Sequence, residues 1–255
     1  MTIVIILDNM KKINPLDDLN LRKFYDELYK REQEENPAYQ IYDQLRVNYI
    51  RQLLNEYRER VLIIGCGARQ DANIFDQRVY AFDLSWYAVN RLKKHNFLRF
   101  VGNSLDIPLP NNSFDVIVCS EVLEHIPDID RAVREIYRII KPSGILIVSS
   151  PNWHSLFGLV RWIAEKVLRK SIHSSGQIYD DWKTLKKYTS ELFPYFKVEK
   201  IRGVWYLPPL HYREKGLSAS WVNLIYKAYS PLENYLSKFL PAFGHLIILR
   251  LRAEK

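Results

Sequence analysis

A short apolar stretch that ends in a Gly-x-Gly turn, followed by a second apolar stretch that ends in an acid, most constrains this fold. The first stretch, residues 61–64, leads into Gly65-Cys66-Gly67, and the second, residues 79–82, leads into Asp83, 18 residues after Gly65. In a βαβ unit, such glycines let the backbone approach a nucleotide, and the acid at the tip of the second strand bonds ribose hydroxyls. The spacing therefore predicts a nucleotide-binding unit around residues 61–83.

The chain around this unit alternates between apolar stretches and segments of helical periodicity. Two helices are predicted first, over 16–35 and 39–57. After them we predict strands over 61–64, 79–82, 97–101, 115–120 and 145–149, with helices near 70–76, 85–95 and 129–140. This alternation favours an α/β fold with a parallel sheet and helices on both faces. Continuous apolar runs such as 145–148 are typical of strands buried on both sides.

The pattern changes after residue 150. A basic amphipathic helix is predicted over 155–170, then a loop over 171–182. A helix near 183–193, a strand near 197–205, an aromatic helical stretch over 217–240 and a last strand over 245–252 follow. Ligands of open parallel sheets bind at the carboxyl ends of the strands. We therefore expect residues 155–175 and 207–240 to cover that edge of the sheet.

The basic excess of the chain is confined to this last part. Residues 161–255 carry 17 Lys and Arg against 8 Asp and Glu, whereas residues 1–160 carry 20 against 21. Such a surface favours an anionic partner, namely a phosphorylated substrate, nucleic acid or a lipid surface, although a solvated basic face explains it equally well. The aromatic residues of the same part suit base stacking, an apolar pocket or packing of a lid.

The sequence also bears on the compartment. No apolar run approaches the roughly 20 residues that span a bilayer, and the apolar run 3–7 is too short for a signal-peptide core. The two cysteines, Cys66 and Cys119, lie in or beside predicted central strands, which is typical of buried thiols rather than of a disulfide framework. We therefore expect a cytoplasmic protein.

Five blocks of the sequence together resemble a known family. They cover residues 61–68, 79–85, 101–110, 114–128 and 131–152. Through them the chain resembles the class I S-adenosylmethionine-dependent methyltransferases, and most closely the group that includes ubiquinone-pathway O-methyltransferases. The resemblance implies S-adenosyl-L-methionine as cofactor. It also implies a Rossmann-like, doubly wound, seven-stranded sheet, mostly parallel with an antiparallel last strand, and a C-terminal helical lid.

The resemblance also implies an organisation within one structural domain. Residues 1–58 would form N-terminal helices that pack on the core, residues 59–152 the Rossmann-like cofactor-binding core, and residues 153–255 the substrate-covering helices and the last two strands.

The cofactor site of the family maps onto ten residues of this chain. Gly65, Cys66 and Gly67 would line the methionine half. Asp83 would bond the ribose hydroxyls, unless it is only the N-cap of the next helix, and Leu84 would pack on adenine. Asn103, Ser104 and Leu105 would form the adenine side, and Ser120 and Glu121 would lie beside the transferring methyl group.

Three positions depart from the family pattern. Asn103 stands where relatives usually have an acid, although an amide oxygen still accepts a hydrogen bond from an adenine amino group. Asp106 is an alternative acceptor, or a residue of the turn. Ile63 stands where many relatives have an acid, and Arg69 where they often have a small residue, so the resemblance implies altered affinity rather than a different fold.

Methyl transfer to a hydroxyl usually needs a base, and histidines are the candidates. His125 follows the fourth core strand and His154 follows the fifth, so both are predicted catalytic residues, with a structural imidazole as the alternative for His125. If the segment is helical, Glu121, Glu124 and His125 share one face. Small-RNA 2′-O-methyltransferases bind a metal with this pattern, but Gln177 stands where relatives often place a further histidine, and we expect no metal.

These features lead to one function and two alternatives. We expect O-methylation of a small, lipid-like or glycan substrate, with anionic or membrane-surface contact through the basic C-terminal part. The first alternative is an RNA methyltransferase, and the second is a non-enzymatic partner subunit with a degenerate site.

Overall fold

The computed structural model describes most of the chain. The described residues are 18–31, 37–54, 60–67, 74–75, 79–92, 97–169, 179–192, 194–208, 210–212 and 215–255.

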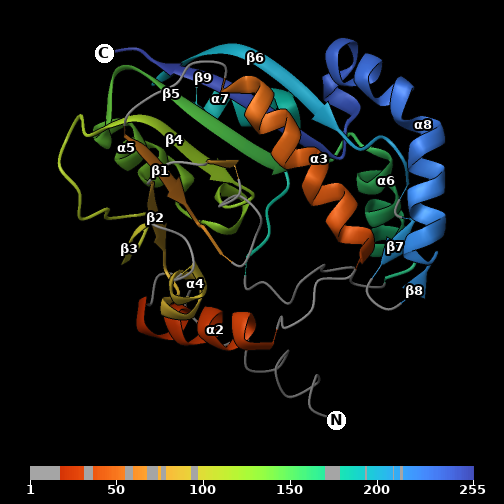
Figure 1. Ribbon diagram of the computed structural model, residues 1–255, viewed down its shortest axis with the longest axis horizontal. Coiled ribbons are helices and arrows are strands. Elements are labelled where there is room, and N and C mark those ends of the chain that lie inside the picture. Colours follow the sequence, from red (N-terminus) through yellow and green to blue (C-terminus); the bar gives the residue numbers. More distant parts are fainter. Residues whose placement is uncertain are drawn as a thin grey trace.

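One seven-stranded sheet forms the centre of the molecule (Figure 1). Its strands are β1 (Val61–Ile64), β2 (Tyr80–Asp83), β3 (Leu98–Val101), β4 (Phe114–Ser120), β5 (Ile140–Pro151), β6 (Phe196–Val204) and β9 (Leu246–Ala253). They lie in the order β3-β2-β1-β4-β5-β9-β6. The first five are parallel, and β9 pairs antiparallel with both β5 and β6. The expected doubly wound, mostly parallel sheet with an antiparallel last strand is confirmed.

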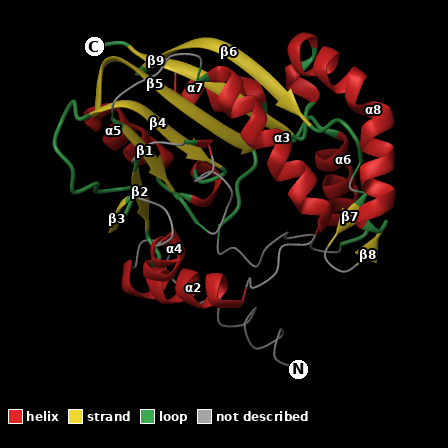
Figure 2. Ribbon diagram, viewed as in Figure 1, coloured by secondary structure: helices red, strands yellow, loops and turns green. Residues whose placement is uncertain are grey.

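Helices cover both faces of this sheet (Figure 2). The structure has α2 (Asp18–Arg31), α3 (Pro37–Leu53), α4 (Trp86–Arg91), α5 (Ile129–Ile139), α6 (Leu156–Trp162), α7 (Leu185–Leu192) and α8 (Ala219–Phe239). Three single-turn or π elements join them: η3 (Leu123–His125), η4 (Ile163–Val167) and η5 (Pro241–Phe243). A two-stranded ribbon, β7 (His211–Tyr212) with β8 (Lys215–Gly216), precedes α8.

Alternating side chains of the strands supply two separate hydrophobic cores. In β5, Ile145 and Ile147 belong to the core that α3, α4 and α8 cover, whereas Leu146 and Val148 belong to the core under α5 and α7. This division follows from the two-residue period of a strand, and it explains why runs such as 61–64 and 145–148 are apolar at every position.

Several element boundaries differ from those predicted. The helix predicted over 155–170 is α6 followed by the π-helical turn η4, and the helix predicted over 85–95 is the shorter α4. The strand predicted over 145–149 is the longer β5, which begins directly after α5 and has a register shift in its pairing with β4 before Ile145. The helix predicted near 70–76 falls mostly outside the described residues.

Within the described part of the chain, no helix combines the length and apolar character that a membrane crossing requires.

Candidate active site

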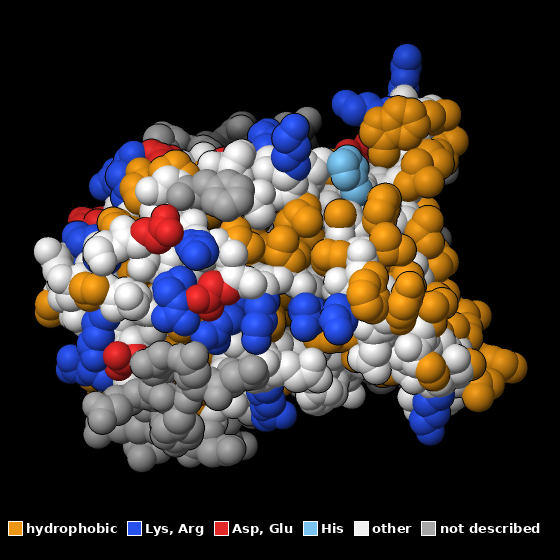
Figure 3. Space-filling view, turned by 90° about the horizontal axis from the view of Figure 1, so that it is seen from above, with side chains coloured by type: hydrophobic (Ala, Val, Ile, Leu, Met, Phe, Trp, Pro, Cys, Tyr) orange, Lys and Arg blue, Asp and Glu red, His pale blue; other side chains and the backbone are white. Residues whose placement is uncertain are grey.

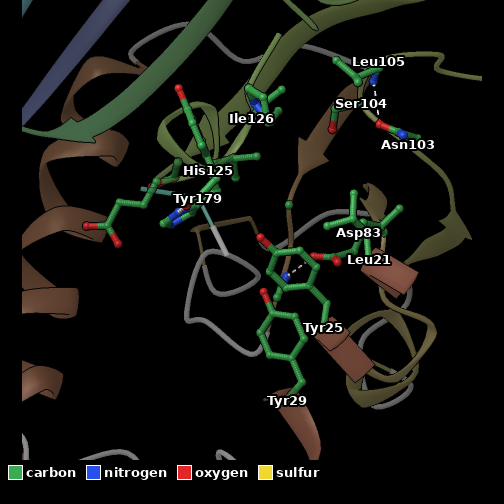
Figure 4. Close-up of a pocket in the computed structure, with 17 residues that line it drawn as sticks. Leu21, Tyr25, Tyr29, Asp83, Asn103, Ser104, Leu105, His125, Ile126 and Tyr179 are labelled. Carbon is green, nitrogen blue, oxygen red and sulfur yellow. Dashed lines mark hydrogen bonds between the residues drawn. The ribbon is translucent and has the colours of Figure 1, made fainter. Parts of the chain in front are cut away.

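A pocket opens at the carboxyl ends of β1, β2 and β4, where α2 crosses the edge of the sheet (Figure 4). Nine of the ten residues predicted for the cofactor line it: Gly65, Gly67, Asp83, Leu84, Asn103, Ser104, Leu105, Ser120 and Glu121. The tenth, Cys66, is buried and is not part of the pocket lining. The pocket therefore lies where ligands of open parallel sheets bind.

The turn after β1 brings bare backbone to the pocket. Gly65 and Gly67 have φ angles of 65° and 45°, in the left-handed region that favours glycine. A Cβ atom on Gly65 would lie 2.2 Å from Cγ2 of Val122, and one on Gly67 would lie 3.1 Å from the Tyr29 hydroxyl. Both the conformation and the space therefore require glycine at Gly65.

Asp83 closes one side of this turn. Its carboxylate accepts hydrogen bonds from the backbone N–H of Gly67 and of Ser85, each at 2.8 Å. Ser85, not Asp83, is the N-cap of α4, because its hydroxyl accepts from the Ala88 N–H at 3.1 Å. Burial raises the pKa of Asp83 to about 6, although its backbone hydrogen bonds oppose that rise. The helix-cap alternative for Asp83 is therefore wrong.

Helix α2 forms a wall of the pocket that the sequence analysis did not predict. Leu21, Tyr25 and Tyr29 line the pocket, and Tyr25 lies beside Asp83 (Figure 4). Burial, and then the charge of Asp83, raise the pKa of the Tyr25 phenol, which therefore stays neutral. The signal in the sequence was the four-residue spacing of these three side chains, which places them on one helical face.

Polar contacts hold α2 in this position. Asp26 accepts from the Tyr87 N–H at 3.0 Å and from the Ser85 hydroxyl, both at the start of α4. At the other end of α2, Asp18 accepts from the Asn103 side-chain amide. The wall that α2 forms is thus tied to the two loops that follow β2 and β3.

The loop after β3 is fixed by the side chain of Asn103. Its Oδ1 accepts from the Leu105 N–H at 2.9 Å. The oxygen that the sequence analysis assigned to an adenine amino group therefore already serves this turn. Asp106, the alternative acceptor, pairs with Asn103 in an isolated bridge and is absent from the pocket lining.

The end of β4 forms the opposite side of the pocket. Glu121 has a φ of 52°, a conformation that costs free energy in a residue other than glycine and that recurs at functional sites. Helix α3 holds this strained turn. The Tyr42 hydroxyl donates to Oε1 of Glu121 at 2.8 Å, and the buried Arg46 donates to the Ser120 hydroxyl. Ser120 also bonds Ser149 at 2.7 Å.

His125 lines the pocket beside Tyr179 (Figure 4). Its Nδ1 lies 2.9 Å from the Tyr179 carbonyl oxygen. Because a carbonyl oxygen can only accept, Nδ1 of His125 donates in this contact.

The structure differs from the helical arrangement considered for Glu121, Glu124 and His125. Glu121 lies at a bend, and only Leu123–His125 form a 3₁₀ turn, η3, in which Glu124 is buried. Among the described residues, no group of three His, Cys, Asp or Glu side chains is placed to hold a metal ion. Gln177, which stands where relatives often place a further histidine, lies outside the described residues.

The second predicted catalytic residue, His154, does not reach the pocket. It follows β5, its side chain is exposed, and it is not part of the pocket lining. The sheet edge after β5 is occupied by Asn152, which is buried and donates to the carbonyl oxygens of Ala242 and Gly244. His154 is turned to the surface at the start of α6.

The C-terminal part contributes less to the pocket than expected. Within the described portion of residues 153–255, Tyr179 is the residue that lines the pocket, and α6 and α8 do not. The cover over the described pocket comes instead from α2, at the other end of the sequence.

Comparisons with known proteins agree with this geometry. A family model described as a methyltransferase domain matches residues 62–148. The chain is 27% identical over 244 residues to an uncharacterized protein of Methanocaldococcus jannaschii, across 92% of this chain and 99% of that one. It is 30% identical over 135 residues to a ubiquinone biosynthesis O-methyltransferase of Pseudomonas fluorescens, across 49% of this chain and 57% of the enzyme. The match thus spans little more than half the length of that enzyme.

A solved structure shows the same fold. It is a Thermotoga maritima protein described as an S-adenosylmethionine-dependent methyltransferase and possible histamine N-methyltransferase. The TM-score is 0.62 at 17% identity, over 86% of this chain and 92% of that one.

Proposed function

This chain belongs to the class I S-adenosylmethionine-dependent methyltransferases, and from that premise we propose that it methylates a hydroxyl group of a small, lipid-like acceptor. The proposal rests on one observation, namely that a half suited to the cofactor and a half suited to the acceptor lie in the same pocket. Gly65, Gly67 and Asp83 form one half, and His125 lies in the other.

The first half fits the cofactor. The bare backbone at Gly65 and Gly67 leaves room for its methionine part, and the Asp83 carboxylate suits two ribose hydroxyls. Leu84 and Leu105 add apolar surface for an adenine ring. When bound, S-adenosylmethionine supplies a methyl group on a sulfonium, which is already activated for transfer.

The protein then has to position the acceptor and remove its proton. The Tyr179 carbonyl fixes the tautomer of His125, so Nε2 is the atom that takes the proton from an acceptor hydroxyl. Glu121 is held by Tyr42 in a strained conformation at the same side, which suits a residue that orients a reactant.

The acceptor half of the pocket is mainly apolar. Val122, Ile126, Pro127 and Tyr179 line it beside His125. Such a lining favours an acceptor with a hydrophobic body and one or two hydroxyls, rather than a free sugar or an RNA end. The ubiquinone biosynthesis O-methyltransferases among the relatives support the same choice.

A calorimetric titration of S-adenosylhomocysteine tests the cofactor half. We expect micromolar binding that a chelator does not change. Loss of binding on chelation would restore the metal-dependent alternative, and absence of binding in both states would favour the non-enzymatic alternative.

A labelling experiment with matched histidine variants tests the acceptor half. S-adenosyl-L-methionine labelled in its methyl group is incubated with the protein and separate lipid, polar-metabolite and RNA extracts. We expect label in the lipid extract, lost at least 100-fold with His125→Gln and retained with the exposed His154→Gln. Label that enters RNA instead would contradict the lipid-like acceptor and support the RNA alternative.

A further inference from the structure

Most of the exposed large hydrophobic side chains of the described residues lie at one end of the molecule. Of the seventeen large hydrophobic residues exposed in the described chain, fifteen lie in two segments, α6 with η4 (residues 156–168) and α8 with its flanks (residues 217–243). We call these two segments the apolar end. They lie together at the right of Figure 1, and the same end is largely hydrophobic in Figure 3. A concentration of this kind on a protein surface marks a site of interaction.

The polarity of α8 is inverted relative to a helix that faces water. Val222 is buried against the core, but so are the polar side chains of Glu233 and Ser237. Trp221 and Tyr235 instead face outward and are each 58% exposed. A helix on a globular surface normally shows its charged side to solvent, so this outward side is built for an apolar surrounding.

The segment α6–η4 has the same inversion. Arg161 is buried under the helix, where it donates to Glu165 and to Asp180, each at 2.8 Å. Trp162 and Val167 are 51% and 62% exposed. Each of the two segments thus buries a charged side chain, Arg161 or Glu233, and presents apolar side chains on the outside.

The exposed charges of the apolar end are all basic. They are Lys166, Lys227 and Lys238, and the exposed Arg169 directly follows the first segment. The two acidic residues of the same segments add no unpaired negative charge to this surface, since Glu165 is paired with Arg161 and Glu233 is buried. Lys238 also lies 5.3 Å from the ring of the exposed Phe239. Aromatic and leucine side chains bordered by lysine and arginine are the composition of helices that lie in a membrane interface.

We propose that the apolar end docks onto an anionic phospholipid surface, with α8 and α6–η4 in the plane of the headgroups. The apolar side chains enter the boundary between headgroups and acyl chains, and the four basic residues face lipid phosphates. The charge of the surface selects an anionic membrane over a neutral one.

A short series of contacts connects the apolar end to the pocket. Arg161 holds Asp180, and the adjacent Tyr179 lines the pocket and accepts from His125. If the function proposed above is correct, the membrane is the source of the lipid-like acceptor. Membrane docking itself does not depend on that function.

Co-sedimentation with vesicles tests the proposal. The full chain is mixed with vesicles of phosphatidylcholine alone, or of phosphatidylcholine with about a third phosphatidylglycerol, without cofactor. We expect binding to the anionic vesicles that weakens with salt. Trp162→Ser with Trp221→Ser lowers the partition coefficient at least tenfold, and Lys227→Gln lowers it about fivefold.

Trp86→Ser is the matched control, because Trp86 is 59% exposed but lies on α4, away from α6 and α8 (Figure 1). We expect this variant to partition like the parent. Equal loss in Trp86→Ser, or no binding of the parent to anionic vesicles, would overturn the proposal. So would a stable dimer in light scattering that the double tryptophan variant dissociates, because a second copy would then cover the apolar end.

Calorimetry of the same variants separates this proposal from the proposed function. We expect unchanged S-adenosylhomocysteine affinity in the double tryptophan variant, because neither side chain lines the pocket. Vesicle binding without cofactor binding would leave docking standing and remove the function, and the reverse result would remove docking alone.

Discussion

Helices α2 and α8 are both amphipathic and both cover an edge of the same core, yet the molecule uses their apolar sides in opposite ways. The aromatic side of α2 faces inward and forms a wall of the pocket. Trp221, Tyr235 and Phe239 of α8 face outward. The buried side of α8 contains the Glu233 carboxylate, which accepts from the Trp205 N–H at 2.7 Å. Periodicity therefore shows that a helix has two sides, and only the tertiary structure shows which side is covered.

The largest effect is expected at the glycine turn that α2 covers. Gly65→Ala should weaken S-adenosylhomocysteine binding at least 100-fold, because a Cβ atom would meet Val122 and the φ of 65° would be strained. Calorimetry measures the loss, and vesicle partition should stay the same. Cys66→Ala is the control, because Cys66 does not line the pocket. A comparable loss in that variant would mean that any change in this turn disrupts the site.

The two sides of α8 should differ in stability by about 2 kcal/mol. Val222→Ala removes buried methyl groups from the core and should lower the free energy of unfolding by about 2 kcal/mol. Leu224→Ala, two residues away and 57% exposed, should change it by less than about 0.5 kcal/mol. Urea denaturation of both variants measures the difference. Equal losses would mean that the outer side of α8 is covered in solution.

Asp83→Ala should weaken S-adenosylhomocysteine binding at least tenfold, because a charged contact to the ribose would be lost. The binding should also depend on pH. Since the pKa of Asp83 is about 6, and only the ionised carboxylate accepts from both hydroxyls, affinity should fall about tenfold between pH 7.5 and pH 5.

Asp83→Asn should flatten that profile, and a parent profile that is already flat would contradict the role of Asp83.

The raised pKa of Asp83 also affects the stability of the protein without cofactor. There, stability falls as the pH increases, whereas cofactor affinity rises. The raised pKa of Asp83 means that the folded state binds the proton more tightly than the unfolded state does. This contribution to stability is complete below about pH 4 and is lost as the pH rises through 6.

A pair of tyrosines compares α2 and α8 directly, with the smallest expected effect. Tyr25→Ala should weaken S-adenosylhomocysteine binding about fivefold, because it opens the pocket wall beside Asp83. Tyr235→Ala, on the outer side of α8, should leave that affinity unchanged and lower vesicle partition instead. The same calorimetric and co-sedimentation measurements serve both variants. If Tyr235→Ala weakened cofactor binding and Tyr25→Ala lowered vesicle partition, the roles given to α2 and α8 would be wrong.

The local part of the site could be predicted from sequence, because a strand, its turn and the acid of the next strand are set by short-range spacing. Gly65, Gly67 and Asp83 line one pocket as expected. Tyr25 was missed because its place depends on the packing of α2 against α4, through Asp26, which no local pattern encodes. His154 was placed in the cleft by its position after β5, but the chain turns there and exposes it.

The order of the strands has a consequence for synthesis of the chain. Strand β9 follows β5 and β6 in the chain, yet it lies between them and bonds both. Strand β6 therefore has no place in the sheet until β9 has emerged from the ribosome. Until then β5 presents an open edge, which invites pairing with other nascent chains. The sheet is thus complete only after β9 has been made, and a chain that stops before β9 carries an unpaired edge on β5.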